Sequence, residues 1–413
     1  MKYGCIGEHL RHSFSKEIHA LIADYDYDIK EIPKNELDDF MTEHDFLAIN
    51  VTIPYKEAVI PHLYYIDEGA RLIGAVNTVV NRDGKLYGYN TDFYGMNALA
   101  AKAGIDFRGK KVIILGTGGT SKTAYAVAKA NGAREIIKAS RTPSDSSVLY
   151  QDVYEYHTDA EIIINTTPVG MFPNIFGKPI EISEFPMLSG VIDAVYNPNK
   201  TQLIAEAKAR GICAEGGLFM LVAQAVRASE IFLGTEYPSK LLYDVFKKIE
   251  AQKINIVLIG MPASGKTTVG NILAKKLCRD MVDTDDVAVK IAGTDIQTVF
   301  ATKGEAAFRD IETQAVFEAA ALSGIVIATG GGAILREENV KALRQNGKIY
   351  FIDRPLEALI PTDDRPTAST RAAIEQRYNE RYEIYRASAD VIIDASLSAE
   401  EVADMILKDF NQD

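Results

Sequence analysis

The sequence has little that would support a disulfide framework, a zinc site or a membrane-spanning segment. Its three cysteines, Cys5, Cys213 and Cys278, are far apart, odd in number and part of no Cys-x-x-Cys or Cys/His cluster. No apolar run approaches the roughly 20 residues that a membrane helix needs, and the first residues lead into a polar segment, not a signal-peptide core. These absences predict a reduced, soluble, cytoplasmic protein.

Basic residues are outnumbered by acidic ones. The 45 Lys and Arg residues face 57 Asp and Glu residues, which gives a net charge of −12. Such a chain is a poor partner for nucleic acid or an anionic membrane, so we expect neither, although a local basic patch would still suit an anionic small ligand. The sequence shows no internal repeat or low-complexity tract, and it does not indicate an oligomeric state.

Short β-branched runs alternate with helical patterns along most of the 413 residues. This alternation predicts parallel α/β sheets, and the length suits about two to four domains. The runs lie at 48–53, 112–115, 135–138, 162–164, 191–194, 256–259, 325–328 and 348–352. The clearest boundary is the polar segment 247–253, which follows an amphipathic helical pattern at 239–249 and precedes an apolar run. A weaker boundary lies near 93–110.

A glycine-rich loop, G-T-G-G-T-S at 116–121, follows one strand pattern and precedes an alanine-rich helical pattern. Backbone N–H groups and a helix N-terminus can meet a pyrophosphate there, although a plain strand-to-helix turn would also explain the glycines. The next strand pattern ends in A-S-R-T at 139–142, without the acidic residue that binds a ribose 2′-hydroxyl. Arg141 suits a 2′-phosphate, so NADP is favoured over NAD, unless Arg141 is an ordinary loop charge.

Short polar groups are spread over the first hundred residues. They form S-x-S at 13–15, N-V-T-I-P-Y-K at 50–56, G-A-V-N-T at 74–78 and N-T-D at 90–92. Each motif alone is typical of a turn or a solvated surface. Together they offer donors and acceptors for a polyhydroxylated ligand, with one Lys and one Asp for proton chemistry.

In this order, ahead of a dinucleotide loop, these motifs resemble those of shikimate dehydrogenases. N-T-T-P-V-G-M at 165–171, D-A-V-Y-N-P at 193–198 and G-G-L-F-M-L at 216–221 extend the resemblance over about residues 1–250. It implies hydride transfer between NADP(H) and the carbonyl of 3-dehydroshikimate, with Lys56 and Asp92 as the catalytic pair. It implies substrate binding by Ser13, Ser15, Thr52, Lys56, Asn77, Asp92, Tyr196 and Gln224. It implies NADP binding by Gly116, Gly118, Gly119, Thr120, Ser121, Ser140, Arg141, Thr142, Thr166, Val195 and Gly216.

Four positions depart from that family's pattern. Lys16 stands where Pro is usual, and Ala20 follows the histidine at 19 where Asn is usual. Ser140 replaces the Asn before Arg141, and the basic residue often found a few positions later is missing, so a single cation would hold the 2′-phosphate. Quinate, a near relative of shikimate, stays possible as a side substrate.

A complete P-loop, G-x-x-x-x-G-K-T at 260–267, lies between a predicted strand at 254–259 and a predicted helix at 267–277. Its backbone N–H groups cradle phosphates, Lys266 reaches the terminal phosphates, and Thr267 can hold Mg²⁺. The pattern predicts an ATP site formed by Met261, Pro262, Ala263, Ser264, Gly265, Lys266, Thr267 and Thr268.

The motifs that follow resemble those of shikimate kinases over residues 254–413. They are D-T-D at 283–285, G-E…F-R…E between 304 and 312, G-G-G at 330–332, D-R-P at 364–366 and R…Y…A between 381 and 389. The resemblance implies that shikimate is bound by Asp285, Arg309, Gly331, Gly332 and Arg381. It also implies that Asp285 helps to activate the attacking hydroxyl, that Asp283 lies near Mg²⁺ through water, and that Arg365 closes over ATP.

The predicted lid, at 361–367, looks short, and a second arginine expected before it has no obvious counterpart.

The sequence therefore predicts two α/β enzymes in one chain. The first has a substrate-binding α/β domain at 1–93, completed by helices at about 225–249, and a Rossmann NADP domain at 94–224. A linker at 250–253 leads to a P-loop kinase domain with a parallel sheet at 254–413. Reduction of 3-dehydroshikimate and phosphorylation of shikimate are consecutive steps of aromatic amino acid precursor (chorismate) biosynthesis.

Two alternatives to this interpretation stay open. One is a shikimate-binding regulatory protein that has lost one activity. The other is a different substrate, quinate for the dehydrogenase or gluconate for the kinase.

Overall fold

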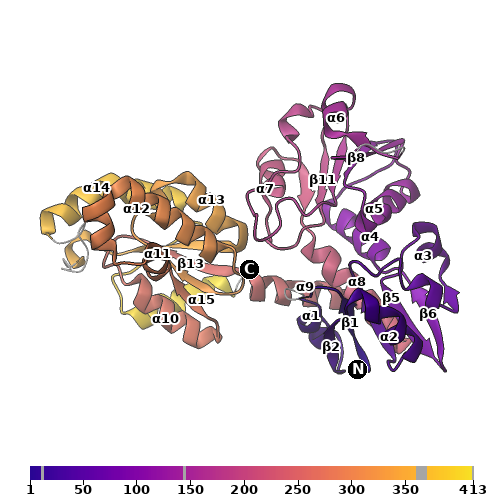
Figure 1. Cartoon of the computed structure of the whole chain (residues 1–413). Coiled ribbons are helices and arrows are strands. Elements are labelled where there is room, and N and C mark those ends of the chain that lie inside the picture. Colours follow the sequence, from indigo (N-terminus) through magenta and orange to yellow (C-terminus); the bar gives the residue numbers. More distant parts are fainter. Residues whose placement is uncertain (11–13, 143–145, 360–369, 412–413) are drawn as a thin grey trace. The chain divides into compact units, whose positions relative to one another are not determined.

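The computed structural model describes residues 1–10, 14–142, 146–359 and 370–411, and it divides into two compact units (Figure 1). The first unit comprises Met1–Asn197 and Thr201–Glu250, and the second comprises Pro198–Lys200 and Ala251–Asp413. Both units are α/β structures with largely parallel sheets, which confirms the predicted fold class. Among the described residues, no helix is long and apolar enough to cross a membrane.

A mixed six-stranded sheet forms the N-terminal part of the first unit. In spatial order its strands are β2 (Tyr27–Glu31), β1 (Tyr3–Gly7), β3 (Ala48–Val51), β5 (Thr78–Arg82), β6 (Lys85–Tyr89) and β4 (Tyr65–Ile66). Three short α-helices of this part of the chain are α1 (Ser15–Ile22), α2 (Leu37–Glu43) and α3 (Glu68–Ile73). The β5–β6 hairpin turns at Asp83 and Gly84, whose φ values of 51° and 78° are both positive. A two-residue hairpin turn favours this left-handed pair, which Asp-Gly adopts readily.

Strand β3 ends at Val51, two residues earlier than the sequence predicted. The N–H of Tyr55 donates to the C=O of Thr52 at 2.9 Å, which closes a turn directly after the strand. Pro54 lies inside this turn and has no N–H to donate to a sheet. The turn places Lys56 beyond the carboxyl end of β3.

A parallel six-stranded sheet forms the rest of the first unit. In spatial order its strands are β12 (Cys213–Glu215), β11 (Gly190–Asp193), β10 (Ile162–Asn165), β7 (Lys111–Leu115), β8 (Glu135–Ser140) and β9 (Val148–Leu149). Strand β7 is buried throughout. Val112 and Ile114 pack with α4 (Asp92–Ala103) and α5 (Gly119–Ala130), whereas Ile113 and Leu115 pack with α6 (Tyr150–Tyr156) and α7 (Gln202–Ala209). A parallel strand covered on both faces needs this continuous apolar run.

Helix α8 (Leu218–Leu233) joins the cores of the two sheets. Its residues 218–226 pack into the core of the parallel sheet, and Ala228 and Phe232 pack with Cys5 and Ala48 of the mixed sheet. Gln224 lies on this helix, so α8 fixes its position relative to both sheets. The domain boundaries given above for this half stay a prediction.

The residues predicted as a linker, 250–253, are helical. They form the last turn of α9 (Ser239–Lys253), and the boundary between the two units falls between Glu250 and Ala251 inside this helix. The segment reads E-A-Q-K, and all four residue types favour helix, with no Gly or Pro to end it. A polar sequence at a boundary therefore continued the helix instead of ending it.

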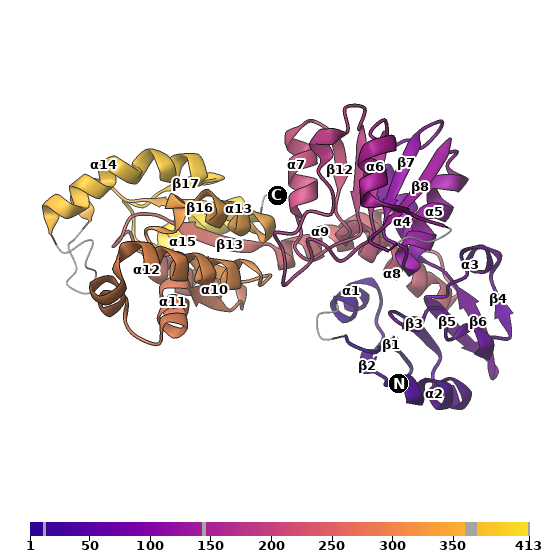
Figure 2. The ribbon, with the colours of Figure 1, turned by 45° about the horizontal axis from the view of Figure 1, so that its top comes forward.

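A parallel five-stranded sheet forms the second unit; its strands β13, β16 and β17 are labelled in Figure 2. In spatial order the strands are β14 (Met281–Asp283), β15 (Val326–Ala328), β13 (Asn255–Ile259), β16 (Gly347–Asp353) and β17 (Val391–Asp394). The helices are α10 (Lys266–Leu277), α11 (Thr284–Ala292), α12 (Ile296–Ala320), α13 (Glu337–Asn346), α14 (Arg371–Ser388) and α15 (Ala399–Phe410). The P-loop, the D-T-D motif and the glycine triplet follow β13, β14 and β15, so all three lie at the carboxyl edge of this sheet.

Candidate active sites

Lys56 and Asp92 form an ion pair in the first unit. The Nζ of Lys56 lies 2.6 Å from Oδ2 of Asp92, and the two side chains are 17% and 8% exposed. Asp92 is the first residue of α4, where the helix N-terminus stabilises negative charge. This short, charge-assisted hydrogen bond is largely excluded from solvent, and it holds the ammonium of Lys56, a proton donor, in a fixed position.

Asn77 is the centre of a hydrogen-bond network beside this ion pair. Its Nδ2 donates to Oγ1 of Thr91 and to Oε1 of Gln224, both at 3.1 Å, and its Oδ1 accepts from the N–H of Thr91 at 2.7 Å. The network reaches the ion pair through the backbone, because the N–H of Val76 donates to the C=O of Lys56 at 2.8 Å. The turn after β3, the start of β5, helix α4 and helix α8 thus bring Lys56, Asn77, Asp92 and Gln224 together.

The other described substrate residues lie at the start of α1, in the turn after β3 and after β11. Thr52 lies in the turn after β3, and Ser15 begins α1; both are half-buried. The ring of Tyr196 meets the ring of Phe14 edge-on at 5.3 Å, and burial raises the pKa of the Tyr196 hydroxyl. Ser13 lies outside the described residues.

Asp193 positions the segment that carries Val195 and Tyr196. Its carboxylate accepts from Nδ2 of Asn165 at 2.9 Å, from the N–H of Val195 at 3.0 Å and from Oγ1 of Thr201 at 2.7 Å. Burial raises the pKa of Asp193 to about 6, and these three donors oppose that rise. Asn165 and Asp193 end neighbouring strands, β10 and β11, so they fix the carboxyl edge of the parallel sheet.

The glycine loop at 116–121 forms an open cradle at the same edge. Gly116 has a φ of 108°, and a Cβ there would come within 2.9 Å of Oγ1 of Thr166. At Gly118 a Cβ would have no heavy atom of a described residue within 4 Å, so these residues leave the space in front of the loop open. Helix α5 starts at Gly119, and a Cβ on Gly119 would lie 4.0 Å from Cδ of Lys56. The glycine loop therefore faces the Lys56–Asp92 pair. A bound dinucleotide needs this arrangement in order to present its nicotinamide to a substrate.

The side chain of Ser121 also belongs to this cradle. It lies in the first turn of α5, and its Oγ is buried without a hydrogen-bond partner among the described residues. Thr120, beside it, is half-buried, and Gly216 is buried where β12 leads to α8. A buried hydroxyl without a partner at a helix N-terminus fits a site built to receive an anionic group.

The predicted 2′-phosphate site lies on the surface at the end of β8. Arg141 and Thr142 are exposed, and the Oγ of Ser140 accepts from the N–H of Thr142 at 3.2 Å. Arg141 is the one cation among the described residues 140–142 of this turn. Its guanidinium is thus accessible to a phosphate at the loop's open side.

In the second unit the P-loop is folded around its own lysine. The Nζ of Lys266, whose residue is 5% exposed, donates to the C=O groups of Gly260 and Met261, each at 2.9 Å. Gly265 has a φ of 94°, in the left-handed region, so this position favours glycine. The remaining residues predicted to bind ATP, from Pro262 to Ser264 and on to Thr268, lie in the same loop and the start of α10.

Two oxygen ligands suited to Mg²⁺ lie beside the P-loop. Oγ1 of Thr267 donates to Oδ2 of Asp283 at 2.9 Å, while Oδ1 of Asp283 accepts from the N–H of Asp285 at 3.0 Å. Mg²⁺ is usually bound by one or two protein oxygens together with phosphates and water, so this pair fits it. Within the described ranges no cluster of three or more His, Cys, Asp or Glu side chains could hold a metal ion.

The predicted acceptor residues of the kinase half come together at the glycine triplet. Nη1 of Arg381 donates to the C=O of Gly331 at 3.0 Å, and a Cβ on Gly331 would lie 3.0 Å from the ring of Pro262 in the P-loop. A side chain at Gly332 would overlap the guanidinium of Arg309, and one at residue 330 would overlap the carboxylate of Asp285. Because these three positions carry no side chain, two arginines, one aspartate and the P-loop can approach the same space. Arg365 lies outside the described residues.

The comparisons with known proteins agree with this geometry. Residues 5–79 match the shikimate dehydrogenase substrate-binding domain, and residues 262–411 match shikimate kinase. A shikimate dehydrogenase (NADP(+)) from Clostridium perfringens is 34% identical over 267 residues, which are 60% of this chain and 98% of that protein. The chain belongs to the shikimate dehydrogenase family. Its residues 262–411 are a shikimate kinase domain.

Solved structures of shikimate dehydrogenases resemble the first unit. Shikimate dehydrogenase 1 from Peptoclostridium difficile is 34% identical with a TM-score of 0.55, and it covers 60% of this chain and 98% of its own. The enzyme from Thermus thermophilus, solved in complex with NADP(H) and shikimate, is 28% identical with a TM-score of 0.54 and covers 60% and 99%. The predicted pairing of a shikimate dehydrogenase with a shikimate kinase is confirmed.

Some residues that support these two sites were given no role by the sequence. Glu312 and Glu305 hold Arg309 from both sides, at 2.6 Å and 2.9 Å, and burial raises the pKa of Glu312 while Arg309 opposes the rise. The sequence could have indicated both glutamates, because carboxylates at i−4 and i+3 from an arginine share its helix face. The sequence indicated a supporting role for Asn165 and Asp193 less clearly, since they stand out only as polar residues at the ends of buried strands.

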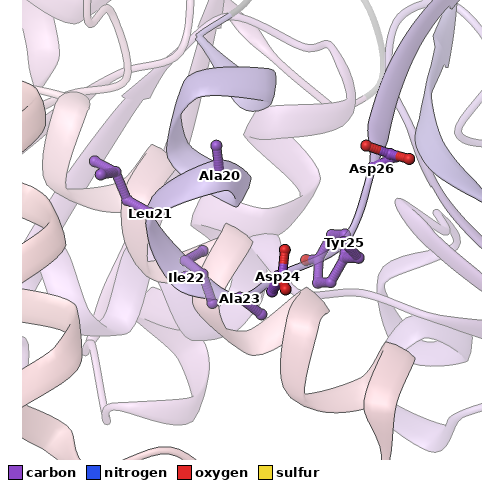
Figure 3. Close-up of a pocket in the computed structure, with 7 residues that line it drawn as sticks. All are labelled: Ala20, Leu21, Ile22, Ala23, Asp24, Tyr25 and Asp26. Atoms are coloured by element: carbon purple, nitrogen blue, oxygen red, sulfur yellow. The ribbon is translucent and has the colours of Figure 1, made fainter.

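A surface hollow in the first unit is not part of either shikimate-pathway site. It has a volume of about 310 Å³ and is lined by seven consecutive residues, from Ala20 to Asp26, at the turn between α1 and β2 (Figure 3). None of the predicted site residues lines it. The active sites are instead defined by the side-chain networks above.

Proposed function

We propose that the chain catalyses two consecutive reactions. The first half reduces 3-dehydroshikimate to shikimate with NADPH, and the second phosphorylates shikimate to shikimate 3-phosphate with ATP. The proposal is carried by the agreement between the two halves. Each keeps the predicted catalytic groups that lie among the described residues, the Lys56–Asp92 pair in the first and Lys266, Thr267 and Asp285 in the second, and the two matched families are both named for shikimate. A regulatory protein that has lost one activity would have other residues at some of these catalytic positions.

In the first half, bound NADPH supplies the hydride. As negative charge develops on the carbonyl oxygen, the ammonium of Lys56, which Asp92 holds in position, donates a proton to it, and the neutral amine of Lys56 then takes up a proton from solvent. Gln224, whose Oε1 is held by Nδ2 of Asn77, turns its Nε2 donors to a ring hydroxyl, and Asn77 exchanges one of its two Nδ2 partners, Thr91 or Gln224, for the substrate. Ser13, Ser15, Thr52 and Tyr196 complete the substrate site in this proposal.

In the second half, Asp285 accepts the proton from the attacking hydroxyl, and Arg309 and Arg381 hold the carboxylate of shikimate with their planar guanidinium groups. Lys266 leaves its loop carbonyls to neutralise the phosphates, and Thr267 and Asp283 would hold Mg²⁺, which stabilises the developing charge. Arg365 would close over the nucleotide.

Arg141 is expected to select NADPH over NADH. Replacing Arg141 with Ala removes the single cation at the proposed 2′-phosphate site, and we expect KM for NADPH to rise about tenfold while KM for NADH changes less than about twofold. Steady-state reduction of 3-dehydroshikimate with both cofactors measures this. The control is Arg108→Ala, an exposed arginine before β7. Equal changes for both cofactors would show that Arg141 does not bind the 2′-phosphate.

The full proposal is tested with the purified wild-type chain, 3-dehydroshikimate, NADPH and ATP with Mg²⁺. We expect NADPH oxidation followed by the appearance of shikimate 3-phosphate, and accumulation of shikimate when ATP is left out. A chain that carries out neither reaction contradicts the enzyme proposal. Faster reactions with quinate or gluconate would instead support the substrate alternatives, although the matched families are named for shikimate. The cytoplasmic location stays a prediction.

A further inference from the structure

Arg354 lies beside the P-loop of the second unit. It is the residue after β16, which pairs with β13, the strand that leads into the loop. The Nη1 of Arg354 is 3.8 Å from the position that a Cβ would occupy on Gly265, the residue before the P-loop lysine. The loop also packs on this strand end, because a Cβ on Gly260 would come within 2.9 Å of the C=O of Ile352. The guanidinium therefore reaches the loop that is expected to cradle phosphates.

Among the described residues, this guanidinium has no partner that explains its position. The Nε of Arg354 is buried and donates to no acceptor in the described part of the chain, and no described carboxylate forms an ion pair with it. An arginine with a structural role looks different in the same unit: Arg279 donates to the C=O groups of Ile254 and Ala251 at 2.7 Å and 2.6 Å. A buried donor without an acceptor is costly unless a ligand supplies one.

We propose that Arg354 binds the phosphate chain of the nucleotide in the kinase half. It would supply the second nucleotide-facing arginine that the sequence around the short lid lacks. The chemistry fits, because a guanidinium forms paired, charge-assisted hydrogen bonds with phosphate oxygens, and the N–H groups around Gly265 face phosphates in a P-loop. This inference rests on the proposed function of the second half and adds a binding residue to it.

Two substitutions test the proposal. Arg354→Met keeps an apolar stem and removes the charge, whereas Arg354→Lys keeps the charge and loses the paired donors. For the Met variant we expect the dissociation constant of ADP, measured by titration calorimetry, to rise about tenfold, in line with the loss of one hydrogen bond between charged groups. KM for ATP should rise by a similar factor, KM for shikimate should change less than about twofold, and the Lys variant should recover part of the loss.

Matched controls separate binding from folding. Arg386→Met changes an exposed arginine on α14 of the same unit and should leave ADP binding unchanged. KM for shikimate reports that the kinase half is folded. Reduction of 3-dehydroshikimate should be unchanged in every variant, because it belongs to the other unit, and it reports the amount of intact chain. Arg354→Gln gives the same comparison if the Met variant does not fold.

The results distinguish a failure of the role of Arg354 from a failure of the proposed function. A wild-type chain that does not phosphorylate shikimate contradicts the proposed function itself. An active wild type whose Met and Gln variants bind ADP within about twofold of it contradicts the role of Arg354. Equal weakening of ADP and shikimate binding would show that Arg354 only supports the fold, and would overturn the inference as well.

Discussion

Lys56→Ala is expected to lower kcat for reduction of 3-dehydroshikimate by about 10²–10⁴-fold, the usual contribution of general acid catalysis, and to leave shikimate phosphorylation unchanged. The reason is geometric. Lys56 is 2.6 Å from Asp92 and is the ammonium that the glycine loop of the dinucleotide site faces. Without it, no positioned group donates a proton as the carbonyl oxygen gains charge. The measurement is the rate of NADPH oxidation with saturating 3-dehydroshikimate.

Three controls make this result specific. Lys34→Ala removes an exposed lysine of the same unit and should leave the rate unchanged. NADP binding to the Lys56→Ala chain should stay within a fewfold of wild type, because the cradle at 116–121 is untouched. NADP binding reports that the dehydrogenase half is folded, and phosphorylation of added shikimate by the same preparation reports that the kinase half is folded. A Lys56→Ala chain with an unchanged rate of reduction would remove Lys56 from the mechanism.

Independence of the two activities follows from how the chain is built. Among the described residues, the hydrophobic clusters around the first two sheets take their buried members from residues 5–249, and the cluster around β13, β15 and β16 takes its buried members from residues 256–410. Each half therefore buries its own apolar surface, which is the main favourable contribution to folding. We therefore expect a substitution in one site to leave the activity of the other half unchanged.

Local features of the fold could be predicted from the sequence because neighbouring residues decide them. The P-loop between β13 and α10 and the glycine loop before α5 are determined by a few consecutive residues, so their type and position were predicted correctly. The end of β3 was less predictable, because Val51, Thr52 and Ile53 all favour strands and the turn at Pro54 overrides them. Segment 250–253 was predicted as a linker from its polarity; its helix propensity makes it helical, and the boundary between the two units falls within it.

Contacts between distant residues could not be predicted without the resemblance to known families. Asn77 and Gln224 are 147 positions apart and meet only because α8 packs across both sheets. Arg354 is a further case, since nothing in its neighbours along the chain indicates that it reaches Gly265. Register and packing place such residues, and neither is visible in local spacing.

Lys266→Ala is expected to have the opposite effect of Lys56→Ala. We expect kcat for shikimate phosphorylation to fall by about 10²–10³-fold or more, because a preorganised cation at the transferring phosphate is lost, while NADPH oxidation continues at the wild-type rate. The Lys266 side chain is nearly buried and donates to two carbonyls of its own loop. The Ala variant therefore also loses loop geometry, and weaker ADP binding should accompany the slower reaction.

Lys275→Ala is the matched control, since this exposed lysine lies on the same helix, α10, away from the loop. Adding 3-dehydroshikimate, NADPH and ATP to the Lys266→Ala chain should make shikimate accumulate, and a mixture of the Lys56→Ala and Lys266→Ala chains should restore formation of shikimate 3-phosphate. Restoration would show that shikimate can leave one chain and reach another through solution. A folded Lys266→Ala chain that loses both activities would contradict the independence of the two halves, because its dehydrogenase groups are unchanged.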